Sequence, residues 1–441
     1  MFQAGFARVD ITPPLGTPMA GYFYVRHADG ILDPIELNAL AVNNGEETAI
    51  LIAADVLYIM ENAATPIREG ISAATGVPVN QIFVHGLHPH TSIRIGSRPG
   101  REVDGISGEQ CDSAYLDVLY RKFADVARMA MDDLRDAEME YGEQKTEKQL
   151  SFVRRYWMKD GSLKSNPGWQ NPDIVRPADD ADNTVRVIRF KRSDAKDIAF
   201  VNFWTHPDVI GGTKFSADWP GFVRRYTEAD LGVHCLVFNG PQGDTNHLDF
   251  SIPKDVWHHD RYGFSGMMGR TIADAVLKVW DKTEPRKDGK IWGEVQMVLT
   301  PTNMQGMDEI DRWKRVKVDY DSGKNRNLSQ NDLGTMGRVS DLENERIFQM
   351  VPVSVMGIGD VVFVGFGGEA FTYYGKMAME AAPDLTVIPL TLINGGQGYL
   401  PTTKAFDEGG YEAFSSRFTP VLQEKLIGAV TEMLGRYRET D

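Results

Sequence analysis

Three of the nine histidines in the chain lie between positions 85 and 90, in the segment HGLHPHTS. In extended backbone, residues two apart point to the same side, so His88 and His90 are expected to face one cavity. That cavity would lie at the end of a short apolar strand predicted over 81–86. Imidazoles placed in this way are good zinc ligands. Histidines at this spacing also occur in loops where they only form hydrogen bonds, so both alternatives stay open.

Two further residues of types that bind metals follow predicted apolar strands. His206 ends the segment VNFWTHP, and Glu369 follows VVFVGFGG. Functional residues often occupy the carboxyl ends of strands in α/β proteins. The glycines before Glu369 allow close backbone approach, and the start of the next helix favours an anion. The alternatives are a structural strand-end histidine and a carboxylate that only caps a helix.

Three loops carry other candidates. Tyr399 and Tyr411 lie in the Gly-rich segment NGGQGYLPTTKAFDEGGYEAF, which suits the wall of a site, although core and surface tyrosines are common. Arg154 lies beside Arg155 in SFVRRYWMKDG, where the alternative is a pair of surface arginines. Asp244 lies in FNGPQGDTNH and is a candidate for orienting a ligand histidine. An aspartate in such a turn more commonly caps backbone amides.

These segments are connected by alternating strands and helices. Apolar residues at three- and four-residue spacing predict helices, and β-branched apolar runs predict strands. The predicted helices cover 61–75, 113–137 and 263–280, and the predicted strands include a pair within 34–56 and segments at 184–190, 198–204, 234–240, 292–299, 351–358, 361–367 and 385–393. The pattern predicts the α/β class, with mixed sheets flanked by helices in a single large catalytic domain over 1–441. The polar segment 303–349 is predicted to be an inserted helical flap.

The composition excludes several classes of partner. The formal net charge is -15, which argues against nucleic-acid binding and against adsorption to anionic membranes. No run of about 18 apolar residues is present, so no membrane span is expected. The start MFQAGFARVD lacks the features of a signal peptide, which predicts a cytoplasmic location. A small-molecule substrate is therefore expected, and the sequence makes no prediction of oligomeric state.

The motifs taken together resemble the catalytic domain of the neutral/alkaline ceramidase family. Matches run in order along the chain: Gly5 to Pro14, Met19 to Tyr22, Leu87 to Thr91, His206-Pro207, Ser216 to Gly221, Gly368-Glu369, Gly398 to Thr402 and Tyr411-Glu412. The resemblance implies a short form of the family's fold, without its C-terminal β-domain. It also implies zinc bound by His88, His206, Glu369 and Tyr399, with His90, Arg154 and Tyr411 around the scissile group.

The chain departs from the family pattern in the loop that contains Asp244. The ceramidase motif Gly-Asp-x-Ser-Pro-Asn is matched by Gly-Asp-Thr-Asn-His, so Asn246 stands where the family has serine. Thr245 is the remaining hydroxyl there, and no base for it is evident. A covalent acyl-enzyme is therefore not expected on this loop, and neither is ceramide as the substrate.

The expected function is a zinc-dependent hydrolase that cleaves an amide or related acyl bond of a small polar substrate with activated water. Tyr411 and Arg154 would donate to the developing oxyanion, and His90 would pass a proton to the leaving group. Asp244 and Asp218 are candidates for orienting other groups. One alternative is a glycoside hydrolase that uses Glu369 with one of these aspartates. Another is a metal-dependent ligand-binding protein without activity.

Overall fold

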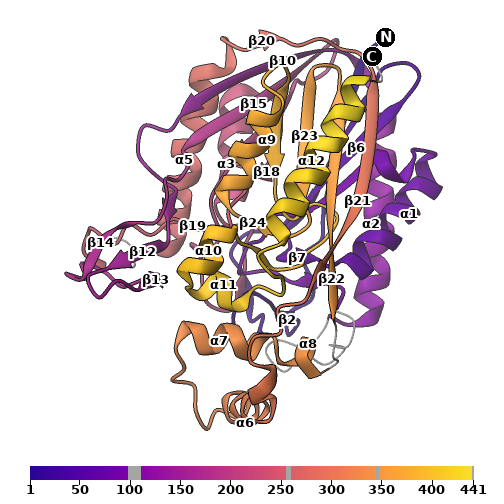
Figure 1. The fold of residues 1–441 in the computed structure, drawn as a ribbon. Helices are drawn as coiled ribbons and strands as arrows, with labels where there is room; N and C mark the ends of the chain where they lie inside the picture. The colour runs from indigo at the N-terminus through magenta and orange to yellow at the C-terminus, as the bar shows by residue number, and fades with distance from the viewer. Residues whose placement is uncertain (98–110, 255–259, 344–346, 440–441) are drawn as a thin grey trace.

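The computed structural model describes residues 1–97, 111–254, 260–343 and 347–439, and they form one mixed α/β domain (Figure 1). Within these residues the larger sheet has nine strands, in the order β18-β16-β15-β10-β1-β5-β6-β8, with β20 beside β10. Their bounds are Gln3–Asp10 (β1), Glu36–Asn43 (β5), Thr48–Ala54 (β6), Ile82–Gly86 (β8), Arg135–Lys145 (β10), Thr184–Arg192 (β15), Ile198–Phe203 (β16), His234–Asn239 (β18) and Glu284–Pro285 (β20). The predicted fold class is confirmed.

The smaller sheet has the order β21-β22-β23-β25. Its strands are Ile291–Pro301 (β21), Phe348–Ile358 (β22), Val361–Phe366 (β23) and Thr386–Leu390 (β25), so the four late strands predicted from the sequence are confirmed. The two sheets pack face to face around one apolar core. In this core the ring of Phe200 in β16 lies 5.3 Å from that of Phe363 in β23. Helices α9 (Thr372–Ala381) and α12 (Leu422–Glu439) cover the outer face of the smaller sheet.

Four further helices pack against the larger sheet: α1 (Glu61–Thr75), α2 (Ser113–Asp132), α3 (Asp218–Leu231) and α5 (Arg261–Trp280). The predicted helix at 61–75 is confirmed, and α5 begins two residues before the prediction. The predicted helix 113–137 is too long at its carboxyl end. Asp133 ends α2, and β10 begins at Arg135, where Ala137 to Lys145 pair with β15. The apolar helical periodicity stops at this point, and pairing with the sheet replaces it.

The segment 303–349 lies between the paired strands β21 and β22, except for its last two residues, which belong to β22. It contains the helices η2 (Met307–Glu309), α6 (Ile310–Asp321), α7 (Gln330–Gly337) and α8 (Val339–Glu343). Residues 344–346 lie outside the described residues. The helices share a small apolar cluster that includes Trp313 and Met336. Helix α7 packs against α11 (Tyr411–Ser415). These helices project from one end of the molecule in Figure 1, and their movement as a flap stays a prediction.

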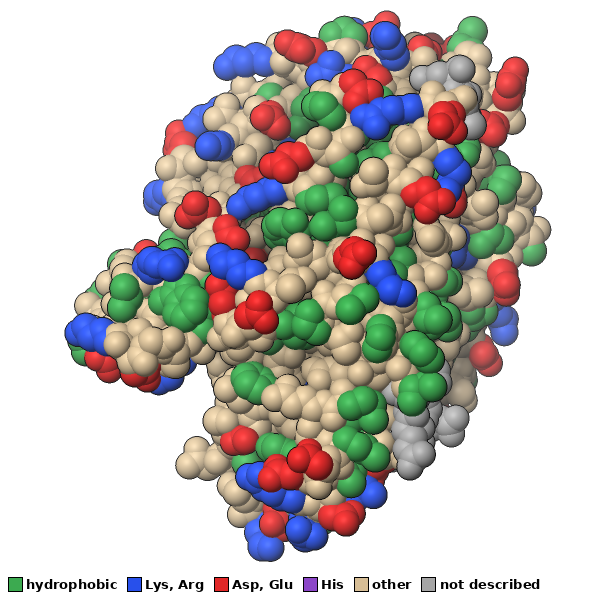
Figure 2. Space-filling model, viewed as in Figure 1, with side chains coloured by type: hydrophobic (Ala, Val, Ile, Leu, Met, Phe, Trp, Pro, Cys, Tyr) green, Lys and Arg blue, Asp and Glu red, His purple; other side chains and the backbone are tan. Residues whose placement is uncertain are grey.

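The surface carries charges of both signs. Acidic and basic side chains alternate over the face in Figure 2, without a continuous basic patch on that face. Among the described residues, no helix is both long enough and apolar enough to cross a membrane.

Three parallel strand pairs position the candidate site. They are β6 with β8, β16 with β18, and β23 with β25. The carboxyl ends of parallel strands lie at the same edge of a sheet. His88 follows β8, His206 follows β16 and Glu369 follows β23, so packing the two sheets together brings these three strand ends to one place.

Candidate metal centre

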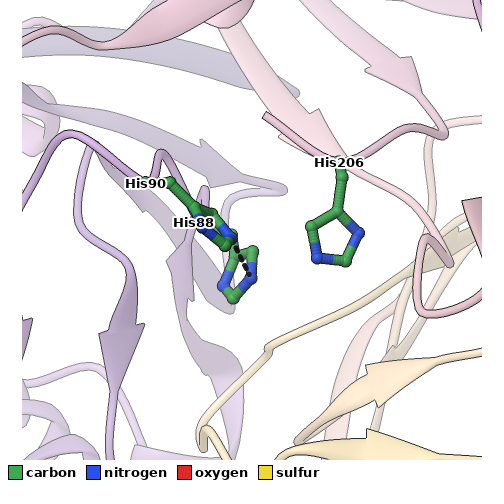
Figure 3. Close-up of side chains that lie close together, drawn as sticks. All are labelled: His88, His90 and His206. Atoms are coloured by element: carbon green, nitrogen blue, oxygen red, sulfur yellow. Dashed lines mark hydrogen bonds between the residues drawn. The ribbon is translucent and has the colours of Figure 1, made fainter. Parts of the chain in front are cut away.

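His88, His90 and His206 form a compact cluster, with ligand nitrogens that all lie within 4.8 Å of one another. Figure 3 shows two of the rings on the loop after β8 and the third facing them from the end of β16. His88 and His206 are almost completely buried. The sequence prediction that His88 and His90 face one cavity is therefore consistent with the structure.

The backbone at His88 is not extended, so the sequence prediction was wrong about the conformation that brings His88 and His90 together. Its φ of 74° lies in the left-handed region, which non-glycine residues rarely adopt. Its backbone N–H donates to the carbonyl of Val56 at 2.9 Å, and its ring Nδ1 lies 3.0 Å from the carbonyl of Leu57. Both contacts hold the residue against the loop after β6. Strain of this kind persists where the surroundings enforce it, commonly at functional sites.

Backbone carbonyls fix the tautomers of two of the rings. A carbonyl only accepts hydrogen bonds, so Nδ1 of His88 donates to Leu57, and Nδ1 of His206 donates to Gln242 at 3.0 Å. In the neutral rings each Nε2 then carries a lone pair. Burial lowers the pKa of His88 to about 4, so this ring is neutral at neutral pH. Neutral imidazoles held through the other nitrogen are the form that binds metals.

Glu369 completes this group. Its Oε2 lies 3.3 Å from Nε2 of His206 and 3.7 Å from Nε2 of His88. The hydroxyl of Tyr58 donates to Oε1. Burial alone would raise the pKa of Glu369, but the nearby imidazoles and this hydroxyl lower it to about 2. The carboxylate is therefore ionised, although it is almost completely buried.

The donor set fits a metal of the zinc type. Nε2 of His206 and Oε2 of Glu369 are buried, and neither has a hydrogen-bond partner among the described residues. Buried polar atoms are rarely left unsatisfied, and two acceptors that face each other repel. A cation between them removes both costs. Nitrogen and oxygen donors of this kind are the ligands that zinc takes.

Tyr399 lies beside Glu369 through backbone pairing. The strands β24 (Glu369–Ala370) and β26 (Tyr399–Leu400) are parallel, with these two residues in register. The Tyr399 ring lies 5.1 Å from the guanidinium carbon of Arg154 and 5.6 Å from the ring of Tyr411. Burial raises the pKa of Tyr399 well above its ordinary value. The structure thus brings Tyr399, Tyr411 and Arg154 to the site, and the role of Tyr399 as a ligand stays a prediction.

His90 is held on several sides. Its backbone N–H donates to Pro207 at 3.1 Å, and its carbonyl accepts from Arg26 at 2.7 Å. Nδ1 lies 3.5 Å from Oδ1 of Asp208, an oxygen that also accepts from the hydroxyl of Tyr22 at 2.7 Å. Nε2 lies 3.3 Å from Nε2 of His88. His90 is thus close enough to act either as a third ligand or as a group beside the metal.

Three residues of the site were missed by the sequence reasoning: Tyr22, Tyr58 and Asp208. Each had a signal that was not used. Tyr22 belongs to the segment Met19 to Tyr22, Tyr58 follows the strand β6, and Asp208 lies two positions after His206.

The carboxylates of the two candidate aspartates accept hydrogen bonds from backbone N–H groups. The carboxylate of Asp244 accepts from the backbone N–H and the hydroxyl of Thr372, both at 2.9 Å, at the start of α9. Asp218 accepts from Val209 and Ile210 and so fixes the loop after His206. These are the contacts of caps and loop anchors. A catalytic role for Asp244 stays a prediction.

A cavity of about 180 Å³ opens in front of this group. His88, His90, Glu369, Tyr399 and Tyr411 line its inner end. Phe23, Leu57 and Leu333 add apolar wall, and Leu333 comes from α7. The inserted helices therefore contribute directly to the cavity.

Comparison with known proteins gives a structural match only. No protein-family model and no curated protein matches the chain. The neutral ceramidase from Pseudomonas aeruginosa superimposes with a TM-score of 0.77 at 15% identity, over 100% of this chain and 75% of the other. A ceramidase complexed with C2 gives a TM-score of 0.75 at 13% identity, with the same coverage. The fold is therefore neutral ceramidase-like, as the sequence motifs implied.

Proposed function

We propose that the protein is a metal-dependent hydrolase that cleaves an amide bond, with zinc as the metal. The observation that carries this proposal is the unpartnered pair of buried atoms, Nε2 of His206 and Oε2 of Glu369, beside the lone pair of His88 Nε2. Those three side chains would hold the ion, with Tyr399 or His90 as the fourth ligand. When bound, zinc lowers the pKa of water and polarises a carbonyl oxygen.

The structural neighbours support the choice of bond. Both are ceramidases by name, and a ceramidase cleaves an amide. The likeness concerns the fold, so the reaction is argued from the residues of this chain. His88, His206 and Glu369 follow the strands β8, β16 and β23, and Arg154 and Tyr411 reach the same place from other segments of the chain.

Arg154 and Tyr411 are placed to stabilise negative charge. Arg154 is buried, and Nε donates to Glu412 at 2.7 Å while Nη2 donates to the carbonyl of Gly243 at 3.0 Å. These contacts fix the guanidinium before substrate arrives. Burial raises the pKa of Tyr411, so its hydroxyl stays protonated as a donor. Donors held in place in a dry site stabilise an oxyanion without a cost of reorganisation.

His90 is the candidate for moving the proton. Nδ1 lies 3.5 Å from Oδ1 of Asp208, and Nε2 lies 3.3 Å from Nε2 of His88 in the cluster. An imidazole in this position can accept a proton from attacking water and deliver it to the departing amine. Tyr22 packs edge-on against the ring at 5.5 Å, which restricts its rotation.

The cavity favours a small substrate of mixed polarity. Its volume suits a short chain, and the apolar wall formed by Phe23, Leu57 and Leu333 suits an acyl group. The tyrosines and histidines at the inner end suit the polar amide.

The alternative of a glycoside hydrolase gains no support from the geometry. It needs a second carboxylate beside Glu369. The carboxylates of Asp218 and Asp244 are both occupied by backbone amides and hydroxyls. Neither is therefore available to act as an acid or a nucleophile.

The test is a panel of small amides, esters and glycosides, assayed with added zinc and after chelation. We expect amide hydrolysis that chelation abolishes and zinc restores. Glycoside hydrolysis that survives chelation, or full activity in protein without metal, would overturn the proposal.

A further inference from the structure

A second cavity borders His206, and we propose that it binds a carboxylate group of the substrate. This inference rests on the proposed function and narrows it to amides that carry a carboxylate near the scissile bond, as N-acyl amino acids do. The cavity has a volume of about 230 Å³, and its walls include Arg154, Asn166, Asn246 and Arg261.

The second cavity adjoins the reacting centre. His206 lines it, and the ring of His206 lies 5.7 Å from that of His90, which lines the first cavity. Tyr22 lines both cavities, and its hydrogen bond to Asp208 lies between them. A substrate with its amide at the histidines would thus place its acyl group in the first cavity and its amine-side substituent in the second.

Two asparagines in this cavity use their amide oxygens as hydrogen-bond acceptors within the protein. The backbone N–H of Leu248 donates to Oδ1 of Asn246, which identifies that atom as the oxygen. Nδ2 of Asn246 then donates one hydrogen to Oδ1 of Asn166 at 2.7 Å. The second hydrogen on Nδ2 of Asn246 is not used by this pair. Because both amide oxygens already accept a hydrogen bond, the network leaves amide hydrogens of Asn246 and Asn166 for a ligand in this cavity.

Two arginines add positive charge. Arg154 uses Nε and Nη2 for protein contacts, and its Nη1 belongs to a guanidinium that lines the cavity. Arg261 is the first residue of α5 and is exposed. A Cβ built on Gly211 would lie 2.5 Å from Nη1 of Arg261, so the guanidinium rests on the backbone of the loop after His206. Guanidinium groups and amide hydrogens together favour a carboxylate over a neutral group.

Asp208 is the one carboxylate among the described residues of this wall, and it does not cancel that preference. Its Oδ1 accepts from Tyr22 and faces His90. The guanidinium groups of Arg154 and Arg261 line the same cavity and outnumber this single carboxylate.

The kinetic test compares N-acetyl amino acids with their C-terminal amides, which are similar in size and lack the negative charge. In the full chain loaded with zinc, we expect kcat/KM to be at least about tenfold higher for the carboxylates, because hydrogen bonds to charged groups are the stronger ones. Equal kcat/KM values for the two series would overturn the inference. Free acetate should inhibit competitively if an unattached carboxylate occupies the same cavity.

Two variants locate the preference. Arg261→Met should raise KM for the carboxylate series about tenfold and leave KM for the neutral series unchanged, and Arg121→Met on the exposed face of α2 is the matched control. Asn246→Asp keeps the acceptor for Leu248 but replaces a donor with a negative charge. It should remove the preference for carboxylates. A preference that survives both changes would place the carboxylate elsewhere.

A binding measurement separates this inference from the proposed function. Calorimetric titration with N-acetylglycine and its methylamide, in chelator-treated full chain, reports on the second cavity without turnover or metal. We expect tighter binding of N-acetylglycine and the loss of that difference in Arg261→Met. If the protein shows these binding differences but hydrolyses no substrate, the carboxylate site is supported and the proposed hydrolase activity is rejected. If the protein hydrolyses amides but shows no such binding differences, the hydrolase activity is supported and the carboxylate site is rejected.

Discussion

Nε2 of His206 and Oε2 of Glu369 face each other at 3.3 Å, although both are buried acceptors. The hydrogen of the imidazole is on the other nitrogen, where it binds the carbonyl of Gln242. Two lone pairs at this distance repel unless a cation or a proton lies between them. The fold therefore imposes on these two residues an arrangement that a bound cation would stabilise.

The first prediction is metal content. Purified protein should contain about one zinc per chain by elemental analysis, as expected for a single set of ligands. His88→Ala and His206→Ala should each lose it, whereas the exposed control His27→Ala should keep it. A fully active protein without metal would contradict the prediction.

The second prediction is that Glu369→Gln changes folding stability in opposite directions with and without metal. The amide can donate to His206 and still accept from Tyr58, so the repulsion is removed. We expect the chelated variant to be more stable than the chelated wild type by about 1 kcal/mol, the usual worth of one hydrogen bond. Zinc should stabilise the wild type and not the variant. Thermal melts with and without zinc measure both effects, and a variant that is less stable in both conditions would refute the argument.

The strand ends that carry the candidate ligands could be predicted because local sequence specifies them. An apolar strand followed by His or by Gly-Glu is visible in the chain, and the structure confirms β8, β16 and β23 at those places. The partners could not be predicted, because they come from distant segments. Tyr58 and Glu369 are 311 positions apart, and only the packing of the two sheets brings them together.

His85 and Asp244 also show that sequence context does not determine which contacts a residue makes. His85 belongs to the same short segment as His88, yet it lies inside β8 and accepts from the backbone N–H of Asn239 at 3.0 Å. Asp244 has the sequence context of both a cap and a ligand-orienting group. Its contact with Thr372, 128 positions later, decides which bonds it makes. Residue type and spacing identify candidate functional side chains, and tertiary contacts determine their hydrogen-bond partners.

The third prediction is Tyr411→Phe. This change removes one donor and keeps the ring that packs against Tyr399 and Phe23. We expect kcat to fall by about 100- to 1,000-fold with little change in KM, as for the loss of an oxyanion donor. Zinc content and melting temperature should be unchanged. A loss confined to KM would instead assign the hydroxyl to substrate binding.

The fourth prediction is that no acyl group becomes attached to Thr245. Its hydroxyl is buried and lies 3.3 Å from the carbonyl of Gln242, to which it donates. No described carboxylate or imidazole is recorded as its hydrogen-bond partner, so no base activates it. Thr245→Val should retain activity within about a factor of two, since a surrounding network of backbone contacts is kept. Mass spectrometry of protein quenched during turnover should find no adduct, and an acyl-Thr245 peptide would reject direct attack by water.

The fifth prediction is a loss of stability in mild acid that arises from His85. Burial lowers the pKa of His85 from its ordinary 6.5 to about 3. The unfolded chain therefore binds a proton on this residue below about pH 6.5 that the folded chain does not bind until about pH 3, and folding stability falls as the pH falls through that window. The slope for one such group is about 1.4 kcal/mol per pH unit. His85→Gln keeps an acceptor for Asn239 and has no titration there. Urea denaturation between pH 7 and pH 5 should show the stability advantage of the wild type over this variant shrinking at that slope, and an advantage that is constant with pH would show that His85 is not held neutral.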